Sequence, residues 1–263
     1  MMRVLVTNDD GVFAPGIAAL ARALAEAGHE VVVAAPADDR SGASAAIGGM
    51  HADESITVEP AELAGLGAFE CYAVAASPAL IVVAACLGGF GPPPDLVASG
   101  INAGANIGRA LLHSGTVGAA LTAANFGRSA LAVSLAAGGD FRWATAAALA
   151  VPTLGWLADQ PAPEVVNLNV PNVEFHHIRG VCDASLAPFG TVRAAIVDAP
   201  GGGLQMELTG DGEPDDGDRP PPGSDTALME DGYATLTSLT GIGATERPEA
   251  AAAVERRLPA RSG

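Results

Sequence analysis

The chain contains no lysine, and all 13 of its basic residues are arginines. Against 30 acidic residues they give a formal net charge of −17, which argues against binding a nucleic-acid polymer through a basic face. A small anionic substrate stays possible, because a bound cation can invert the field around an acidic site. The charge balance therefore indicates small-molecule partners and no nucleic-acid polymer.

Cysteine and long apolar runs are also scarce. The three cysteines, Cys71, Cys86 and Cys182, show no CxxC spacing, so the sequence predicts neither a disulfide framework nor a zinc site. The N-terminus lacks the pattern of a signal peptide, and no apolar stretch is long and uninterrupted enough to span a bilayer. We expect a cytoplasmic protein with no membrane partner.

The 263 residues allow one large domain or a domain with an appendage, and 49% of them are hydrophobic. The first 35 residues predict a β–α–β unit. Residues 3–7 and 30–35 are apolar strands, and between them a helix begins at Pro15 and ends before Gly28. Its apolar residues recur at helical spacing: Ile17, Leu20, Ala21 and Leu24.

The alternation of strands and helices continues to about residue 170. We expect strands over residues 55–58, 95–99, 129–136 and 165–170, and helices over residues 77–87, 113–125 and 141–158. Strands that alternate with helices are typical of a parallel sheet. The sequence therefore predicts an α/β fold with a Rossmann-like, mostly parallel sheet flanked by helices.

After Pro171 the alternation of strands and helices gives way to short β-like segments separated by turns. Short β-like pieces are expected over residues 178–181, 192–197, 204–209 and 233–239. Residues 210–224 are acidic and rich in Gly and Pro, which predicts a mobile loop, and residues 246–263 are expected to be a short helix or a frayed tail. We therefore divide the chain into an α/β catalytic core (1–172), a C-terminal β-rich extension (173–245) and a tail (246–263).

The end of the first strand carries two adjacent carboxylates, Asp9 and Asp10, followed by Gly11. In an α/β protein the carboxyl ends of parallel strands open into the crevice where ligands bind. Two carboxylates there are costly unless something positive lies between them, and Mg²⁺ or Mn²⁺ prefers oxygen ligands. The alternative is a plain turn, since Asn-Asp-Asp-Gly also favours turns.

Three further polar segments are expected at the same edge of the sheet. The loop at residues 36–44 follows the second strand and contains Ser41, and the Gly-rich run at residues 99–108 contains Asn102 and Asn106. Residues 113–118 open a helix whose N-terminus, with its hydroxyls and free N–H groups, could bind an anion. Taken singly, these segments could be an ordinary loop and ordinary helix caps; their occurrence after consecutive strands favours a site.

These segments together resemble the SurE family, the stationary-phase survival nucleotidases. The resemblance covers about the first 170 residues well and residues 223–233 more loosely. The motifs that carry it occur in the family's order and spacing: VLVTNDDG at residues 4–11 with Pro15-Gly16, RSGAS at 40–44, SGINAGAN at 99–106, HSGTVGAA at 113–120 and NLNVP at 167–171.

The resemblance implies a metal-dependent phosphatase that acts on nucleoside monophosphates, as a 5′- and/or 3′-nucleotidase, with possible action on short polyphosphate. It implies one divalent cation, Mg²⁺ or Mn²⁺, in each subunit, and a homodimer or homotetramer joined through the C-terminal extension. The metal ligands it assigns are Asp9, Asp10, Ser41 and Asn102. The phosphate-binding positions it assigns are Asn106, Ser114, Gly115 and Thr116.

The chemistry expected of such a site is electrostatic, because phosphoryl transfer asks mainly for positioning and charge neutralisation. We expect Asp9 or Asp10 to accept the proton of the attacking water, and the sequence does not distinguish the two. His113, beside the phosphate segment, is either an acid for the reaction or a structural histidine.

One departure from the family pattern is at Leu80, where an acidic residue is usual. If Ser77 caps the helix, Leu80 is its third residue, where an acid would complete a capping box. We therefore predict that Leu80→Asp leaves turnover within a few-fold and the fold neutral to slightly more stable. A large loss of stability would instead mean that Leu80 belongs to the core.

Two other functions are alternatives to a nucleotidase. Haloacid-dehalogenase phosphatases also place an acid after their first strand, but the position of their nucleophilic Asp is Asn8 here, which cannot form the covalent intermediate. The second alternative is a non-catalytic metal- or nucleotide-binding protein that kept the fold and lost turnover, which the change at Leu80 would favour.

Overall fold

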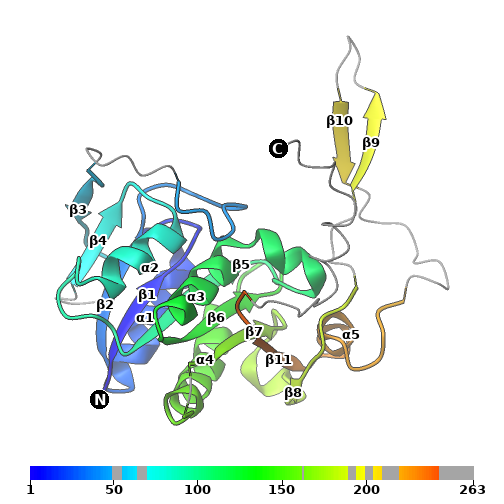
Figure 1. The fold of residues 1–263 in the computed structure, drawn as a ribbon. Coiled ribbons are helices and arrows are strands. Elements are labelled where there is room, and N and C mark those ends of the chain that lie inside the picture. The colour runs from blue at the N-terminus through cyan, green and yellow to red at the C-terminus, as the bar shows by residue number, and fades with distance from the viewer. Residues whose placement is uncertain are drawn as a thin grey trace, which may run out of the picture.

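We analysed a computed structural model of the chain, which describes residues 1–48, 55–63, 70–161, 163–188 and 219–242, together with the backbone of strands β9 and β10. Most of the described strands form one nine-stranded sheet in the order β3-β4-β2-β1-β5-β6-β7-β11-β8, and β9 and β10 pair separately as an antiparallel ribbon. Figure 1 shows the helices packed on the two faces of the large sheet. The predicted α/β architecture is confirmed.

The sheet contains β1 (Arg3–Thr7), β2 (Glu30–Pro36), β3 (Val58–Pro60), β4 (Glu70–Val74), β5 (Leu96–Ala103), β6 (Ser129–Leu135), β7 (Val165–Val170), β8 (Val181–Asp183) and β11 (Ala234–Leu239). The separate ribbon is β9 (Ala194–Asp198) with β10 (Leu204–Leu208). The α-helices are α1 (Pro15–Glu26), α2 (Pro78–Cys86), α3 (Gly115–Asn125), α4 (Trp143–Ala158) and α5 (Asp225–Glu230), with 3₁₀ turns η1 (Gly108–His113) and η2 (Phe175–His177).

The central strands β4, β2, β1, β5, β6 and β7 are all parallel. After β1 the chain moves outward through β2 to one side, and after β4 it returns to the other side of β1 as β5. The order therefore reverses between β1 and β5, which makes the carboxyl ends of these two strands the topological switch point, where ligands bind in this fold class.

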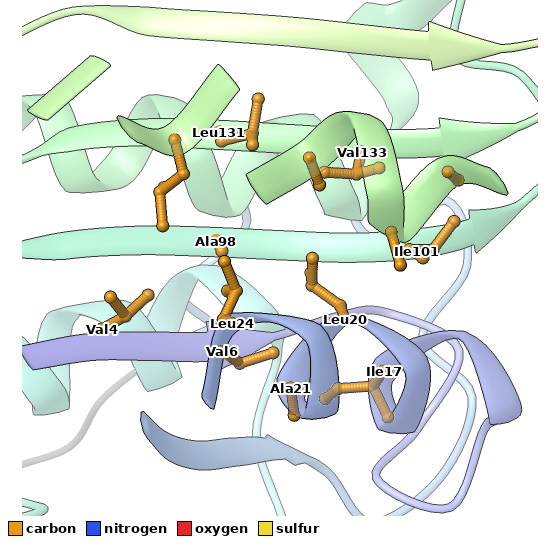
Figure 2. Packing of buried hydrophobic residues seen from close by; sticks show 14 of the residues in the cluster. Val4, Val6, Ile17, Leu20, Ala21, Leu24, Ala98, Ile101, Leu131 and Val133 are labelled. Carbon is orange, nitrogen blue, oxygen red and sulfur yellow. The ribbon is translucent and has the colours of Figure 1, made fainter. Parts of the chain in front are cut away.

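Helices α1 and α4 cover one face of the sheet, and α2 and α3 cover the other. The α1/α4 face is packed with large aliphatic side chains, and Figure 2 shows Leu20 and Leu24 of α1 against Val4, Val6 and Ala98 of the sheet. The helix spacing foreseen in the sequence is confirmed, since Ile17, Leu20, Ala21 and Leu24 are all fully buried. This core fixes the strand ends that carry the polar segments.

Two strand predictions were displaced. The strand expected at residues 55–58 is β3 at Val58–Pro60, and the one expected at 178–181 is β8 at Val181–Asp183. Both are three-residue strands far out in the sheet, where pairing with a neighbour and not local composition sets the ends. The 3₁₀ turn η1 and helix α5 were not predicted.

Strand β5, expected to end at Ser99, continues to Ala103. Its pairing with β6 shifts between Ser99 and Asn102, as in a β-bulge. Gly100 lies there at φ +137°, and a Cβ would be 2.3 Å from the carbonyl oxygen of Val133, so only glycine fits. The bulge carries Asn102 and Ala103 to the switch point.

The prediction for Leu80 was wrong in one respect. Ser77 does cap α2, since its hydroxyl accepts the N–H of Leu80 at 3.3 Å. However, Leu80 is only 9% exposed and belongs to the core cluster under α2 and α3. An aspartate there would replace a core contact with a buried charge, so Leu80→Asp is now expected to destabilise the fold.

The C-terminal extension continues the same sheet. β11 pairs antiparallel with β7 and parallel with β8, so in the part of the chain that is described, residues beyond 172 complete the core sheet. The loop predicted at residues 210–224 lies outside the described residues except for 219–224, and the tail at 246–263 lies wholly outside them. Within the described residues, no helix has the length and apolar character needed to cross a membrane.

Candidate active site

The structure brings the segment after β1 against the loop after β2 and the end of β5. The N–H of Arg40 donates to the backbone carbonyl of Asp9 at 2.7 Å, and the N–H of Val12 donates to that of Pro36 at 2.8 Å. The backbone of Ala103 lies close enough to the Asp10 carboxylate to lower its pKa. Asp9 and Asp10 therefore lie beside the residues that flank Ser41 and Asn102.

Asp9 is buried against the N-terminus of α3. Its Oδ2 accepts the N–H of Gly115 at 3.0 Å, and its Oδ1 accepts the hydroxyl of Thr116. A Cβ on residue 115 would lie 2.7 Å from the Asp9 carboxylate, so the glycine allows this close approach. An anion at a helix N-terminus is favoured by the free N–H groups and the helix dipole, and here that anion is Asp9 itself.

Asn102 and Ser41 present neutral oxygens near the two acids. The Nδ2 of Asn102 donates to the carbonyl of Gly104 at 2.7 Å, which leaves its Oδ1 as an acceptor. Ser41 is exposed, and its N–H donates to the Oδ1 of Asp39 at 2.7 Å. The hydroxyl and the N–H of Ser41 lower the pKa of Asp39.

The site carries an excess of negative charge. Burial raises the pKa of Asp9. Burial, with the neighbouring charges of Asp9 and Asp39, raises the pKa of Asp10 to about 6. Among the described residues the ion pairs link Arg3 to Glu30 and Glu70 and Arg142 to Glu174, and none reaches Asp9 or Asp10.

Such a site fits a hard divalent cation. Two desolvated carboxylates without a basic partner, together with a hydroxyl and an amide oxygen, are the donor set that Mg²⁺ or Mn²⁺ prefers. The described residues contain no group of three or more His, Cys, Asp or Glu side chains able to hold a metal. Any cation here would therefore take its remaining ligands from neutral oxygens and water.

Two of the residues that the sequence assigned to phosphate are already bonded to Asp9. Gly115 and Thr116 direct their N–H and hydroxyl groups to its carboxylate, and the Ser114 hydroxyl accepts the N–H of Val117 at 3.2 Å as the cap of α3. The first turn of α3 therefore supports Asp9 before any substrate is present.

Asn106, the fourth residue assigned to phosphate, lies in the segment between β5 and η1 and is held by polar side chains of β6 and β7. Its Nδ2 donates to the hydroxyl of Ser134 at 2.8 Å. Its carbonyl accepts the Nδ2 groups of Asn167 and Asn169 at 2.8 and 2.9 Å, and its N–H donates to the Oδ1 of Asn169 at 2.8 Å.

The sequence predicted NLNVP at residues 167–171 as a family motif but gave Asn167 and Asn169 no role in the site, and Ser134 was not named. The signal was present in the alternation Asn167-Leu168-Asn169, since alternate residues of a strand face the same side and carboxamides are unusual in a buried parallel strand. Asp225 was also missed; it is fully buried and accepts the N–H of Gly108 at 2.7 Å, tying the extension to the site. His113 is exposed at the end of η1.

Known proteins are similar to this chain over most of its length. Residues 4–191 match the family model described as survival protein SurE. The 5′-nucleotidase SurE of Alkalilimnicola ehrlichii is 37% identical over 242 residues, covering 91% of this chain and 89% of that protein. The 5′/3′-nucleotidase SurE of Photorhabdus laumondii is 36% identical over 248 residues, covering 91% and 90%.

A solved structure shows the same fold. The crystal structure of the SurE protein from Aquifex aeolicus superposes with a TM-score of 0.76 at 26% sequence identity, covering 97% of this chain and 99% of that one. The match extends through the C-terminal part as well as the α/β core. By sequence and by fold, this chain belongs to the SurE family.

Proposed function

We propose that this protein is a metal-dependent phosphatase that hydrolyses nucleoside monophosphates at the 5′ or the 3′ position. The observation that carries the proposal is the pair of desolvated carboxylates, Asp9 and Asp10, at the switch point of the sheet, with which no basic side chain of the described residues forms an ion pair. The named activities of the relatives, 5′-nucleotidase and 5′/3′-nucleotidase, support the choice of substrate.

The cation in this proposal is one Mg²⁺ or Mn²⁺ per subunit, held by Asp9, Asp10, Ser41 and Asn102. When bound, such a cation polarises a phosphoryl oxygen and lowers the pKa of a coordinated water. The position of the loop after β2 and of the end of β5 beside Asp9 and Asp10 supports this ligand set.

Asp10 is the better placed of the two acids to accept the proton of the attacking water. The carboxylate of Asp9 accepts hydrogen bonds from Gly115 and Thr116, whereas that of Asp10 is partly exposed. A general base must be able to reach the proton that it removes, and the more open carboxylate can do so.

Phosphate binding is assigned to Asn106 and Ser114, with Gly115 and Thr116 acting through Asp9. A serine hydroxyl can donate as well as accept. The Asn106 amide can therefore turn over, accept the Ser134 hydroxyl on its Oδ1 and present its Nδ2 to a phosphate oxygen. The choice between the two amide orientations depends on the hydrogen-bond network, so a bound phosphate would favour the second.

Two finer features remain part of the proposal. The same chemistry could cleave the terminal phosphoanhydride of short polyphosphate, and the C-terminal extension is the segment through which a homodimer or homotetramer would form. A non-catalytic binding protein is the alternative, since a metal site and a nucleotide site could persist without turnover.

Phosphate release from a panel of 5′- and 3′-nucleotides, p-nitrophenyl phosphate and tripolyphosphate, with Mn²⁺, Mg²⁺ or EDTA, tests the proposal. We expect nucleotide hydrolysis with Mn²⁺ or Mg²⁺, none in EDTA, and recovery when the cation is restored. Nucleotide binding without release of phosphate in either cation would establish the non-catalytic alternative.

A further inference from the structure

The side chain of Asn169 closes a two-bond bridge around the backbone of Asn106. Its Oδ1 accepts the Asn106 N–H at 2.8 Å and its Nδ2 donates to the Asn106 carbonyl at 2.9 Å. Asn106 belongs to neither β5 nor η1. The bridge replaces the backbone partners that the residue would have in a sheet.

Other buried polar groups surround this bridge. Asn167, two residues earlier on β7, donates to the same carbonyl of Asn106 at 2.8 Å. The hydroxyl oxygen of Ser134 on β6 accepts a hydrogen bond from the Nδ2 of Asn106. Asn167, Asn169 and Ser134 are all fully buried. Three side chains from two strands thus converge on Asn106, and together they bond its N–H, its carbonyl and its side chain.

The arrangement is costly for stability, since it leaves buried polar atoms unpaired. Within the described structure, the Oδ1 of Asn167 and the hydroxyls of Thr235 and Thr237 on β11 have no hydrogen-bond partner. A buried polar group without a partner destabilises the fold, because the loss of its bonds to water is not compensated. Apolar residues occupy the other face of the same strand, at Val166, Leu168 and Val170. Selection for stability alone would favour apolar residues on both faces.

We infer that Asn169 is a positioning residue for the reaction, which fixes Asn106 so that its carboxamide meets the phosphate. The inference rests on the proposed function, in which Asn106 contacts the substrate. The two bonds from Asn169 restrain the peptide units on both sides of Asn106, and the bond to Ser134 sets the plane of its amide. Loss of the bridge would let the residue move, and a displacement of about 1 Å at a reacting centre can lower the rate by about 10²-fold.

A double-mutant cycle between Asn169→Ala and Asn106→Ala separates positioning from a purely structural role. The Asn106→Ala variant keeps the backbone N–H and carbonyl, so the Asn169 bridge survives in it, whereas the side-chain contacts with phosphate and with Ser134 are lost. We expect Asn169→Ala to lower kcat/KM and the affinity for inorganic phosphate in the presence of Mn²⁺ by about tenfold or more in the wild type. In the Asn106→Ala background the further loss should be less than about twofold.

The change in Tm caused by Asn169→Ala, unlike the change in kcat/KM, should not depend on the residue at position 106. Asn169→Ala should lower Tm by the same amount in both backgrounds, because the backbone bonds that it removes are present in both. Asn169→Asp is the second variant if the alanine protein does not fold: it is nearly isosteric and can still accept the N–H, but it places an oxygen against the Asn106 carbonyl.

Asn172 offers a matched control. It also bridges a loop backbone, accepting the N–H of Arg142 at 2.8 Å and donating to the carbonyl of Asp140 at 3.3 Å, but none of the proposed ligands lies in that loop. Asn172→Ala should lower Tm and leave kcat/KM unchanged.

Equal losses of kcat/KM from the Asn169 substitution in both backgrounds would overturn the inference, as would an Asn106→Ala variant with full activity and phosphate affinity. A wild-type protein that binds phosphate but hydrolyses no nucleotide would refute the proposed function, while the cycle in phosphate affinity still decides the role of Asn169. A protein that neither hydrolyses nucleotides nor binds phosphate would refute both.

Discussion

The two faces of the central sheet are built for different purposes. On β7 the residues facing α4 are Val166, Leu168 and Val170, all apolar and buried, whereas the opposite face carries Val165 followed by Asn167 and Asn169. The same strand therefore supplies core packing on one side and polar anchors on the other. Backbone pairing is common to both faces, so the difference lies wholly in the side chains.

The change to polar residues on the α2/α3 face occurs only near the carboxyl ends of the strands. Leu5 of β1 and Val97 of β5 are apolar, and two residues later come Thr7 and Ser99. On β6 the same step leads from Ala132 to Ser134. Because Asp9 continues the alternation of β1 to the N-terminus of α3, the polar end of this face is the floor of the proposed active site. The α1/α4 face stabilises the sheet along its full length.

The largest expected effect is on activity and comes from the acids at the polar end. Asp10→Asn should lower kcat by about 10²-fold or more, as loss of a charged group at such sites does, and chelation should abolish activity. Phosphate release with Mn²⁺ measures the first effect and dialysis against EDTA the second. Full activity after that dialysis would contradict a metal-dependent site.

On the apolar face, Leu154→Ala should affect stability instead. Leu154 of α4 is fully buried in the core against the sheet, and truncation of such a leucine costs about 2–5 kcal/mol of unfolding free energy. Urea denaturation measures this loss. Activity per folded molecule should stay within about twofold; a specific loss of kcat at a temperature where the variant is fully folded would break the division between the two faces.

A smaller loss of stability is expected from Leu80→Asp on the α2/α3 face, away from its polar end. It should destabilise the fold by about 2 kcal/mol, since a core leucine is lost. The slight exposure of position 80 and the positive end of the α2 dipole reduce the free-energy cost of placing a carboxylate there. Ser77→Ala is the matched control, with an expected loss of about 1 kcal/mol from the missing cap. Thermal and urea unfolding of both variants check the order. A neutral or more stable Leu80→Asp would restore the capping-box reading of this position.

Thr116→Val distinguishes a role of Thr116 in cation binding from a role in phosphate binding. The sequence assigned this hydroxyl to phosphate, but it donates to the carboxylate of Asp9. A hydrogen bond to a charged group contributes about 1.5–3 kcal/mol, so cation affinity should fall by about tenfold or more. Calorimetric titration with Mn²⁺, followed by titration with inorganic phosphate, measures both. Unchanged cation affinity with weakened phosphate binding would return Thr116 to the substrate.

The smallest expected effect is the pH dependence of the cation-free fold. The Asp10 pKa is about 6 in the folded protein, raised by burial and by its acidic neighbours from an ordinary value of 3.8. Between these values the folded state binds more protons than the unfolded state, so this group makes the cation-free protein less stable as pH rises towards 6. Tm in EDTA at pH 5 and pH 7 should therefore differ more for the wild type than for Asp10→Asn. Equal differences would place the Asp10 pKa near its ordinary value.

Cation binding should show the reverse dependence, because the cation needs the ionised carboxylate. Below about pH 6 the proton competes at Asp10, and Mn²⁺ affinity should fall by up to about tenfold for each pH unit. The two trends together distinguish a titrating ligand from general acid unfolding.

The sequence by itself determined the features that depend on neighbours along the chain. Periodicity and end signals predict α1, with its buried stripe and the Gly28 that follows it, and the valine-rich segment Val165–Val170 predicts a strand. The adjacent acids at Asp9 and Asp10, placed directly after a strand, identified the candidate site, because a strand end in an α/β fold leads to the crevice between strands.

Only the tertiary structure decided which donors meet which acceptors. It placed the Gly115 N–H and the Thr116 hydroxyl on Asp9, more than one hundred residues away in the chain, and it buried Leu80 where local capping rules favoured an acid. It also joined Asn169 to Asn106 across 63 residues. Local sequence fixes backbone propensity and the face that a side chain occupies, but a hydrogen bond between distant segments exists only once the sheet order brings them together.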